Sequence, residues 1–230
     1  PLSALLLAEL EDEAGLPPGW LSVVVGPSAE IGDVLVEDER VKAITFTGSS
    51  GVGWGIKARA PKKKVSLELG NATPVIVAAD ADVDAAAKAM AAHAFSFAGQ
   101  SCISVQRIYV EQGLYDDFVA GFVPKVEQLV VGDPADAETD VGPVIDEGAR
   151  ERILSWIEEA RDGGAEVLSG GDLDGDLIRP TVIANAAPDL KVCREEVFGP
   201  VCVVNSYESL DEAIALANGT RYGLQAGIFT

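Results

Sequence analysis

The sequence predicts an α/β protein, in which the short strands of a mainly parallel sheet alternate with helices on both faces. Short runs rich in apolar and β-branched residues at 41–47 and 65–69 are typical of strands buried in a sheet, and 105–110 alternates inward and outward as a strand does. Between such runs, apolar residues recur at helical spacing, as from Val83 to Phe97. Strands alternating with helices in this way favour a parallel sheet covered on both sides.

Up to residue 70, helices and strands are expected to alternate. Leu6, Leu7 and Leu10 share one stripe of a first helix, which the glycines and prolines of 15–19 end. The predicted elements are a helix over 3–13, a strand over 21–25, a mostly polar helix, a strand over 41–47, a helix over 54–60 and a strand over 65–69.

The pattern restarts after residue 70. Asp82 is a good N-cap for a helix that ends at Gly99. The expected elements are strands over 74–79, 105–110, around 167, 181–184, 201–204 and 226–229, and helices over 82–99, 114–130, 146–162 and 210–218. We therefore expect a domain boundary near residue 70, which gives domains of 1–70 and 71–230.

The composition argues against several classes of protein. The chain has 17 Lys and Arg against 37 Asp and Glu, a net charge of −20, and such a field repels the phosphates of nucleic acids. No apolar run approaches the roughly 20 residues that span a membrane, and the N-terminus has no secretory signal. Two explanations of the acidic excess stay open, an adaptation to high salt and an ordinary acidic enzyme surface.

Three cysteines and one histidine restrict the metal and redox chemistry. Cys102, Cys193 and Cys202 form no C-x-x-C pair, and His93 has no second histidine beside it. An ordinary zinc site is therefore not expected. Reduced thiols in a cytoplasmic protein are the simplest interpretation.

Gly48-Ser-Ser-Gly-Val-Gly53 lies between a buried strand and a helix. Glycines let a backbone approach a ligand, and the start of a helix offers unpaired N–H groups to an anion. The spacing matches neither the Walker motif nor G-x-G-x-x-G. Taken alone, a plain tight turn is the simpler interpretation.

Gly99-Gln-Ser-Cys102 follows an apolar helix. A thiol in a glycine-flanked turn can be reachable, and backbone donors nearby can activate it. A buried structural cysteine is the alternative. A dyad of Cys102 with His93 would make a cysteine hydrolase, although a histidine at the edge of a helix stripe is usually part of the packing.

Glu68 lies within the apolar run 65–70, Val-Ser-Leu-Glu-Leu-Gly. A buried carboxylate is costly unless it is paired, and burial brings such a group toward the behaviour of a general base. A charge at a strand edge that faces solvent is an equal alternative.

In their order along the chain, these motifs resemble the aldehyde dehydrogenase superfamily. The resemblance rests on Leu67-Glu-Leu-Gly70, Gly99-Gln-Ser-Cys102, Glu195-Glu-Val-Phe-Gly-Pro200, Phe46-Thr-Gly-Ser49, Pro1-Leu-Ser-Ala and Tyr222-Gly-Leu. The correspondence runs collinearly from the first residue to the last. It is specific for the superfamily and much less so for a substrate.

The resemblance implies an aldehyde dehydrogenase-like fold, with 1–70 as the C-terminal part of a Rossmann-like cofactor domain and 71–230 as a second α/β domain carrying the nucleophile. It implies oxidation of a small aldehyde to a carboxylic acid with NAD or NADP. Cys102 would be the nucleophile, through a thiohemiacetal and a thioester, and Glu68 the base for hydrolysis. Members that pass the acyl group to coenzyme A generally lack a carboxylate matching Glu68. The implied cofactor contacts are Phe46, Gly48, Ser49, Val52, Gly53, Leu69, Glu196 and Phe198.

The family pattern also implies a homo-oligomeric parent enzyme, a dimer or a tetramer. The stretch 100–107 is similar to a branch that oxidises small polar aldehydes such as lactaldehyde, phosphonoacetaldehyde or glyceraldehyde 3-phosphate. Asn71 departs from the pattern, because the family usually has a second glycine there.

The family places an oxyanion-hole asparagine and a ribose-binding lysine upstream of Pro1, and further substrate-pocket and oligomerisation segments beyond Thr230. We therefore expect the 230-residue chain alone to have little or no activity, since losing one oxyanion donor costs roughly 2.7–4 kcal/mol. The alternative function is a catalytically incomplete fragment or pseudoenzyme that acts only as a folded α/β module.

Overall fold

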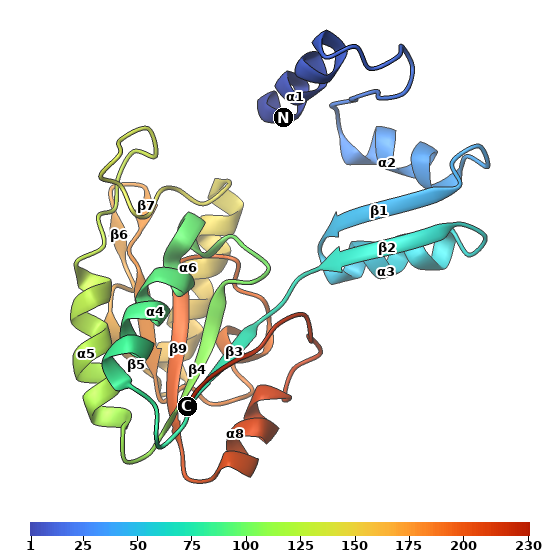
Figure 1. Cartoon of the computed structure of the whole chain (residues 1–230). Helices are drawn as coiled ribbons and strands as arrows, with labels where there is room; N and C mark the ends of the chain where they lie inside the picture. Colours follow the sequence, from blue (N-terminus) through green and yellow to red (C-terminus); the bar gives the residue numbers. More distant parts are fainter. The chain divides into compact units, whose positions relative to one another are not determined.

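The computed structural model describes residues 1–230, which form two compact units, Pro1–Leu69 and Gly70–Thr230 (Figure 1). Both units combine helices and strands. The division falls between Leu69 and Gly70, directly after the run that contains Glu68.

Unit 1, residues 1–69, contains a β–α–β arrangement. Its strands β1 (Ala43–Gly48) and β2 (Lys64–Leu69) are parallel, and α3 (Ser50–Arg59) connects them. The helices α1 (Leu2–Glu13) and α2 (Ser28–Glu37) come before it. Every second strand residue points toward a small apolar core, which consists of Val36, Ile44, Phe46, Ile56, Ala60 and Val65.

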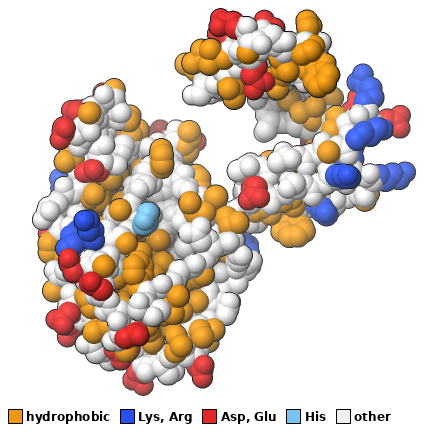
Figure 2. All heavy atoms as spheres, viewed as in Figure 1, with side chains coloured by type: hydrophobic (Ala, Val, Ile, Leu, Met, Phe, Trp, Pro, Cys, Tyr) orange, Lys and Arg blue, Asp and Glu red, His pale blue; other side chains and the backbone are white.

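The prediction of a strand over 21–25 is wrong. This segment is neither helix nor strand, and Leu21, Val24 and Val25 are exposed. A strand needs a neighbour for its backbone hydrogen bonds, and β1 and β2 pair only with each other. The helix α1 also buries none of its residues, so its leucines lie on the surface of the unit (Figure 2).

Unit 2, residues 70–230, is built on a six-stranded sheet with the strand order β10-β3-β4-β9-β8-β5. The predicted parallel sheet is confirmed except at one edge, where β5 runs antiparallel to β8. The strands are β3 (Thr73–Val77), β4 (Val105–Glu111), β5 (Glu166–Ser169), β8 (Thr181–Ala184), β9 (Val201–Tyr207) and β10 (Gly227–Phe229).

Helices cover both faces of this sheet (Figure 1). On β4, Ile108 and Val110 pack with α4 (Val83–Phe95) and α5 (Tyr115–Glu127), whereas Tyr109 packs toward α8 (Leu210–Ala217). On β8, Ile183 packs with α6 (Glu147–Asp162) and α7 (Lys191–Arg194). Because both faces are buried, the strands are apolar at most positions.

Caps and backbone conformation decide where the helices begin and end. Asp82 accepts a hydrogen bond from the Ala85 N–H and begins α4, as predicted. The helix expected over 82–99 ends at Phe95, because Phe97 and Ala98 have left-handed backbones in the 3-10 turn η1 (Ser96–Gly99). The helix α3 begins at Ser50 rather than at residue 54, and α5 ends at Glu127 rather than at residue 130. The short α7 and the hairpin of β6 (Leu173–Asp174) and β7 (Leu177–Ile178) were not predicted.

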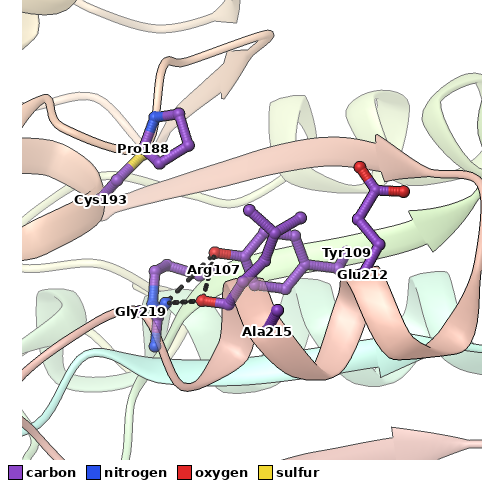
Figure 3. A pocket seen from close by; sticks show the side chains of 8 residues that line it. Arg107, Tyr109, Pro188, Cys193, Glu212, Ala215 and Gly219 are labelled. Atoms are coloured by element: carbon purple, nitrogen blue, oxygen red, sulfur yellow. Dashed lines mark hydrogen bonds between the residues drawn. The ribbon is translucent and has the colours of Figure 1, made fainter.

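Arg107 on β4 joins three parts of unit 2. Its side chain is only 3% exposed, and it donates to the backbone oxygens of Ala72, Leu216 and Ala217 at 2.9 Å each and to the Tyr109 hydroxyl at 3.2 Å. The two last carbonyls belong to the C-terminal end of α8, where a cation is favoured (Figure 3). A cavity of about 250 Å³ adjoins these groups.

We predict that Arg107→Met lowers the free energy of unfolding by at least about 3 kcal/mol, because it removes charged donors from several partly or fully buried carbonyls. Urea denaturation measures this value. Arg179→Met is a matched control, since Arg179 pairs only with exposed carboxylates of Asp172 and Asp174, and it should change stability much less. Equal losses of unfolding free energy in the two variants would contradict the role of Arg107 in joining these parts of unit 2.

Candidate active site

In unit 1, the predicted cofactor residues gather at the carboxyl ends of β1 and β2. The parallel register places Gly48 beside Leu69 and Thr47 beside Glu68. A Cβ atom at Gly48 would lie 2.6 Å from the Phe46 ring, so this glycine allows the ring to fold against the strand end. In parallel sheets, this edge is where ligands usually bind.

The helix α3 begins at the same edge. Ser49 is its N-cap residue, and the exposed Val52 and buried Gly53 lie in its first turn. A Cβ at Gly53 would lie 2.3 Å from the Leu69 side chain, so the glycine lets the helix pack on the end of β2. The first N–H groups of a helix are unpaired and suit an anion.

Glu68 lies on the exposed side of β2, whose residues alternate between exposed and partly buried. The sequence left open whether Glu68 is buried or faces solvent. In unit 1, its carboxylate faces solvent. Glu68 belongs to unit 1 and Cys102 to unit 2.

In unit 2, Cys102 lies in a turn between η1 and β4. Phe97, Ala98 and Gly99 have φ values of 52°, 55° and 68°, so three consecutive residues are left-handed just before the motif. Gln100 fixes the turn, because its side chain accepts from the Ile145 N–H at 2.7 Å and donates to the Pro143 oxygen at 3.2 Å.

Cys102 is the most accessible of the three thiols. Cys193 and Cys202 are buried, and burial raises the pKa of Cys193 to about 11 and that of Cys202 further. The alternative that Cys102 is a buried structural cysteine is therefore wrong, since Cys102 is partly exposed. No backbone oxygen accepts the Cys102 N–H, which leaves a donor beside the thiol.

His93 is exposed on α4 and lines a cavity with Ser101 and Ile103. The hydrogen bond recorded at this residue uses its backbone oxygen, with the Ser104 hydroxyl as donor. The structure thus pairs the His93 ring with no thiol. It also does not bury the ring, as ordinary packing would.

The Cys102 turn packs directly on the segment 195–200, Glu-Glu-Val-Phe-Gly-Pro. A Cβ at Gly99 would lie 2.0 Å from the Gly199 oxygen, and a Cβ at Gly199 would lie 2.4 Å from the Ile153 side chain. Two backbones can approach this closely only where side chains are absent. The glycines of the two motifs therefore hold the Cys102 turn and the Glu196 loop together.

Glu196 and Phe198 lie in this loop. The Glu196 carboxylate accepts from the Asn71 N–H at 2.8 Å, and a Cβ at Gly70 would lie 2.2 Å from it. Burial raises the pKa of Glu196, against the opposing effects of the Asn71 N–H and the positive charge of Arg152. Phe198 is partly exposed, with a left-handed φ of 48°.

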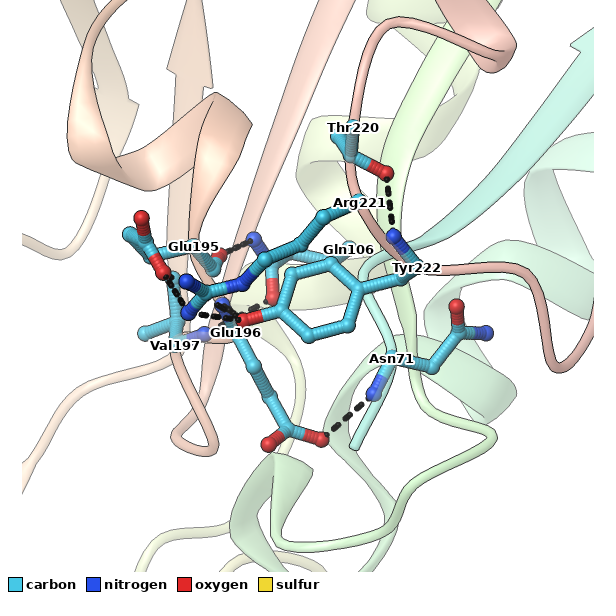
Figure 4. A network of polar contacts seen from close by, with 8 residues as sticks. All are labelled: Asn71, Gln106, Glu195, Glu196, Val197, Thr220, Arg221 and Tyr222. Carbon is cyan, nitrogen blue, oxygen red and sulfur yellow. Dashed lines mark hydrogen bonds and ion pairs between the residues drawn. The ribbon is translucent and has the colours of Figure 1, made fainter. Parts of the chain in front are cut away.

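Sequence reasoning assigned no role to the residues that hold the Glu196 loop. Gln106 and Tyr222 bond to its backbone (Figure 4). Arg152 donates to the Val197 oxygen at 2.9 Å. Gln106 had a usable signal, because a polar side chain inside an apolar strand needs buried partners.

No group of three or more His, Cys, Asp or Glu side chains is placed to hold a metal ion. None of the helices combines the length and the apolar character needed to cross a membrane.

Comparison with known proteins identifies the family of this arrangement. The sequence profile of the aldehyde dehydrogenase family matches residues 1–230. The chain belongs to the aldehyde dehydrogenase family. The family prediction and the α/β fold are thereby confirmed.

Among related proteins, the 3-sulfolactaldehyde dehydrogenase of Priestia aryabhattai is 49% identical over 230 residues, all of this chain and 48% of that protein. The mitochondrial succinate-semialdehyde dehydrogenase of Oryza sativa is 42% identical, over all of this chain and 45% of its own length. The chain thus spans about half the length of the curated relatives it matches.

Solved structures of aldehyde dehydrogenases resemble it closely. The NAD-dependent enzyme of Sinorhizobium meliloti matches with a TM-score of 0.96 and 40% identity, over 99% of this chain and 46% of that one. The enzyme of Mycobacterium tuberculosis complexed with NAD+ has a TM-score of 0.96 and 38% identity, over 100% and 49%. The NADP-dependent glyceraldehyde-3-phosphate dehydrogenase of Bacillus halodurans, complexed with NADP, has a TM-score of 0.96 and 41% identity. The match covers 100% of this chain and 48% of that one.

The raised pKa of Glu196 predicts a pH dependence. The folded chain holds a proton on Glu196 more tightly than the unfolded chain does, so this contribution to stability is present below about pH 4 and is lost as the pH rises through the raised value. Glu196→Gln removes the titration and keeps an oxygen for the Asn71 N–H. We expect the stability of the variant, relative to the parent, to increase as the pH rises above about 4.

Urea denaturation at a series of pH values measures this difference. Glu138→Gln serves as the control, because Glu138 is exposed, and its stability difference should stay flat. A difference for Glu196→Gln that is constant or falls with pH would contradict the burial of this carboxylate.

Proposed function

We propose that the whole protein oxidises an aldehyde to a carboxylic acid with NAD+ or NADP+, with Cys102 as nucleophile and Glu68 as base. The observation that carries the proposal is the Cys102 turn, in which a partly exposed thiol lies beside a free N–H and is packed on the Glu196 loop. In this proposal, unit 1 is the C-terminal part of the cofactor domain and unit 2 is the catalytic domain.

The proposed cofactor contacts fit a dinucleotide. The diphosphate of the cofactor would lie at the end of β1, against Gly48, Ser49 and the first turn of α3, which contains Val52 and Gly53. Phe46 and Leu69 pack against the glycines of this segment. In unit 2, the Glu196 carboxylate suits the hydroxyl groups of a ribose, and Phe198 offers an exposed apolar ring. The bound nicotinamide would supply the hydride acceptor of the reaction.

The Cys102 thiolate attacks the aldehyde carbon and forms a C–S bond, and the carbonyl oxygen becomes an oxyanion. The Cys102 N–H is the donor that this chain offers to the oxyanion, since no backbone oxygen competes for it. Loss of the hydride from the same carbon leaves a thioester on Cys102.

Glu68 then takes a proton from a water molecule, whose oxygen attacks the thioester carbon. The C–S bond breaks, the acid departs and the thiolate is restored. This role of Glu68 rests on the resemblance of Leu67-Glu-Leu-Gly70 to the family motif, and not on burial, because the carboxylate at the end of β2 is exposed.

We propose a small polar aldehyde as substrate. Relatives named for 3-sulfolactaldehyde and for succinate semialdehyde support this class. A cytoplasmic location is proposed because a relative of Rattus norvegicus, 40% identical over 236 residues, is named cytosolic aldehyde dehydrogenase 1. Assembly as a dimer or tetramer is proposed because several leucines of α1 are exposed in unit 1.

Substitutions of Cys102 and Glu68 in the whole protein test the proposal. We expect Cys102→Ser to abolish turnover. Glu68→Gln should keep a stoichiometric burst of reduced cofactor, because acylation does not need the base, and should slow steady-state turnover by about 10²–10⁴-fold. Stopped-flow absorbance of the reduced cofactor separates the two phases.

Cys193→Ser is the control for removing a thiol, because a hydroxyl can keep its hydrogen bond to the Ala186 oxygen. It should retain activity. Turnover that survives in Cys102→Ser, or a burst that Glu68→Gln abolishes together with the steady state, would refute the assigned roles. An inactive whole protein with intact cofactor binding would instead support the pseudoenzyme.

A further inference from the structure

The backbone around Glu196 is fixed on both sides by one buried side chain. Gln106 on β4 is 5% exposed. Its amide nitrogen donates to the oxygens of Glu195 at 2.7 Å and Val192 at 2.9 Å, and its amide oxygen accepts from the Val197 N–H at 2.9 Å. The residue before Glu196 and the residue after it are therefore both bonded to the same amide.

Tyr222 holds the N–H group of Glu196 itself. Its hydroxyl accepts from the Glu196 N–H at 3.2 Å and from Arg221 at 3.2 Å, and it lies 3.3 Å from the Glu195 carboxylate, to which it can donate (Figure 4). A phenol has one donor and two acceptor positions, so every one of them is used here.

From this held backbone, the Glu196 side chain extends to a single hydrogen-bond donor. Its carboxylate points to the Asn71 N–H (Figure 4) and rests against Gly70, where no Cβ is present. Asn71 itself is fixed, because its side chain donates to the Thr73 hydroxyl at 2.8 Å and to the Gln225 oxygen at 3.2 Å. The acceptor and its donor are thus each held by separate contacts.

We propose that Gln106 and Tyr222 are positioning residues that hold the Glu196 carboxylate ready for the hydroxyl groups of the cofactor ribose. This rests on the proposed role of Glu196. Only a carboxamide can donate twice and accept once at the Gln106 position, which matches two carbonyls and one N–H. Without these contacts, the Glu195–Val197 peptides can rotate, and the carboxylate must be ordered again each time a ligand binds.

The geometry can be tested in the 230-residue chain itself. In the parent, the Asn71 amide proton should shift in NMR spectra as Glu196 titrates, and Glu196→Gln should remove this shift. We expect Gln106→Met to reduce the titration shift of Asn71 by at least about half, because the carboxylate no longer stays at that N–H. Tyr222→Phe, a milder change that keeps the ring, should reduce it in the same direction and covers the case in which Gln106→Met does not fold.

Asn205→Leu is the matched control. Asn205 also clamps a backbone residue with both ends of a side-chain amide, at Ala186, but has no bond to the Glu196 loop. Asn205→Leu should leave the titration shift of the Asn71 amide proton unchanged. If Gln106→Met or Tyr222→Phe leaves the titration shift of the Asn71 amide proton unchanged, the proposal is overturned.

Binding of NAD+ or NADP+ to the whole protein gives the second readout. Gln106→Met should weaken binding about tenfold in the parent and by less than about twofold when Glu196 is already Gln, since the effect acts through Glu196. Additive losses would mean a merely structural role and overturn the proposal. If Glu196→Gln leaves binding intact, the cofactor role of Glu196 fails instead, and the NMR titration still decides whether Gln106 and Tyr222 position it.

Discussion

The close approach of Gly99 to the Gly199 oxygen is the constraint on which the site in unit 2 depends. A Cβ at Gly99 would lie 2.0 Å from that oxygen, so the two backbones are in contact where any other residue would separate them. This contact joins the end of the α4–η1 segment to the loop before β9. It brings the turn of Cys102 and the loop of Glu196 to one place, although 94 positions separate these residues in the sequence.

The same constraint accounts for the unusual backbone nearby. Phe97 and Ala98 share the left-handed conformation of Gly99, which costs about 1–2 kcal/mol per non-glycine residue. Such strain persists only where surrounding contacts compensate it. Gln100, bonded to the 143–145 segment, and Gln106, bonded to both sides of Glu196, supply contacts of this kind on the two sides of Cys102.

The sequence predicted features that depend on local chemistry or on burial over a whole strand. The strand β4 and the cap of α4 by Asp82 are of this kind. The segment 21–25 was misassigned because a strand depends on a pairing partner, which the run itself does not reveal. The left-handed Phe97 could not be predicted either, since it is imposed by packing of distant segments. Cys102 and Glu68 were found only as an ordered set of motifs, whereas the contacts of Gln106 required coordinates.

The rate at which iodoacetamide alkylates Cys102 tests the contact between Gly99 and Gly199 most directly. This rate is compared between the variants Gly99→Ala and Gly164→Ala. Both glycines are left-handed, but a Cβ at Gly164 meets nothing within 4 Å, so that variant carries the backbone strain alone. We predict that Gly99→Ala changes the rate at least about fivefold and Gly164→Ala less than about twofold, while the buried Cys193 and Cys202 stay unreactive in both. Equal rates in the two variants would contradict the account.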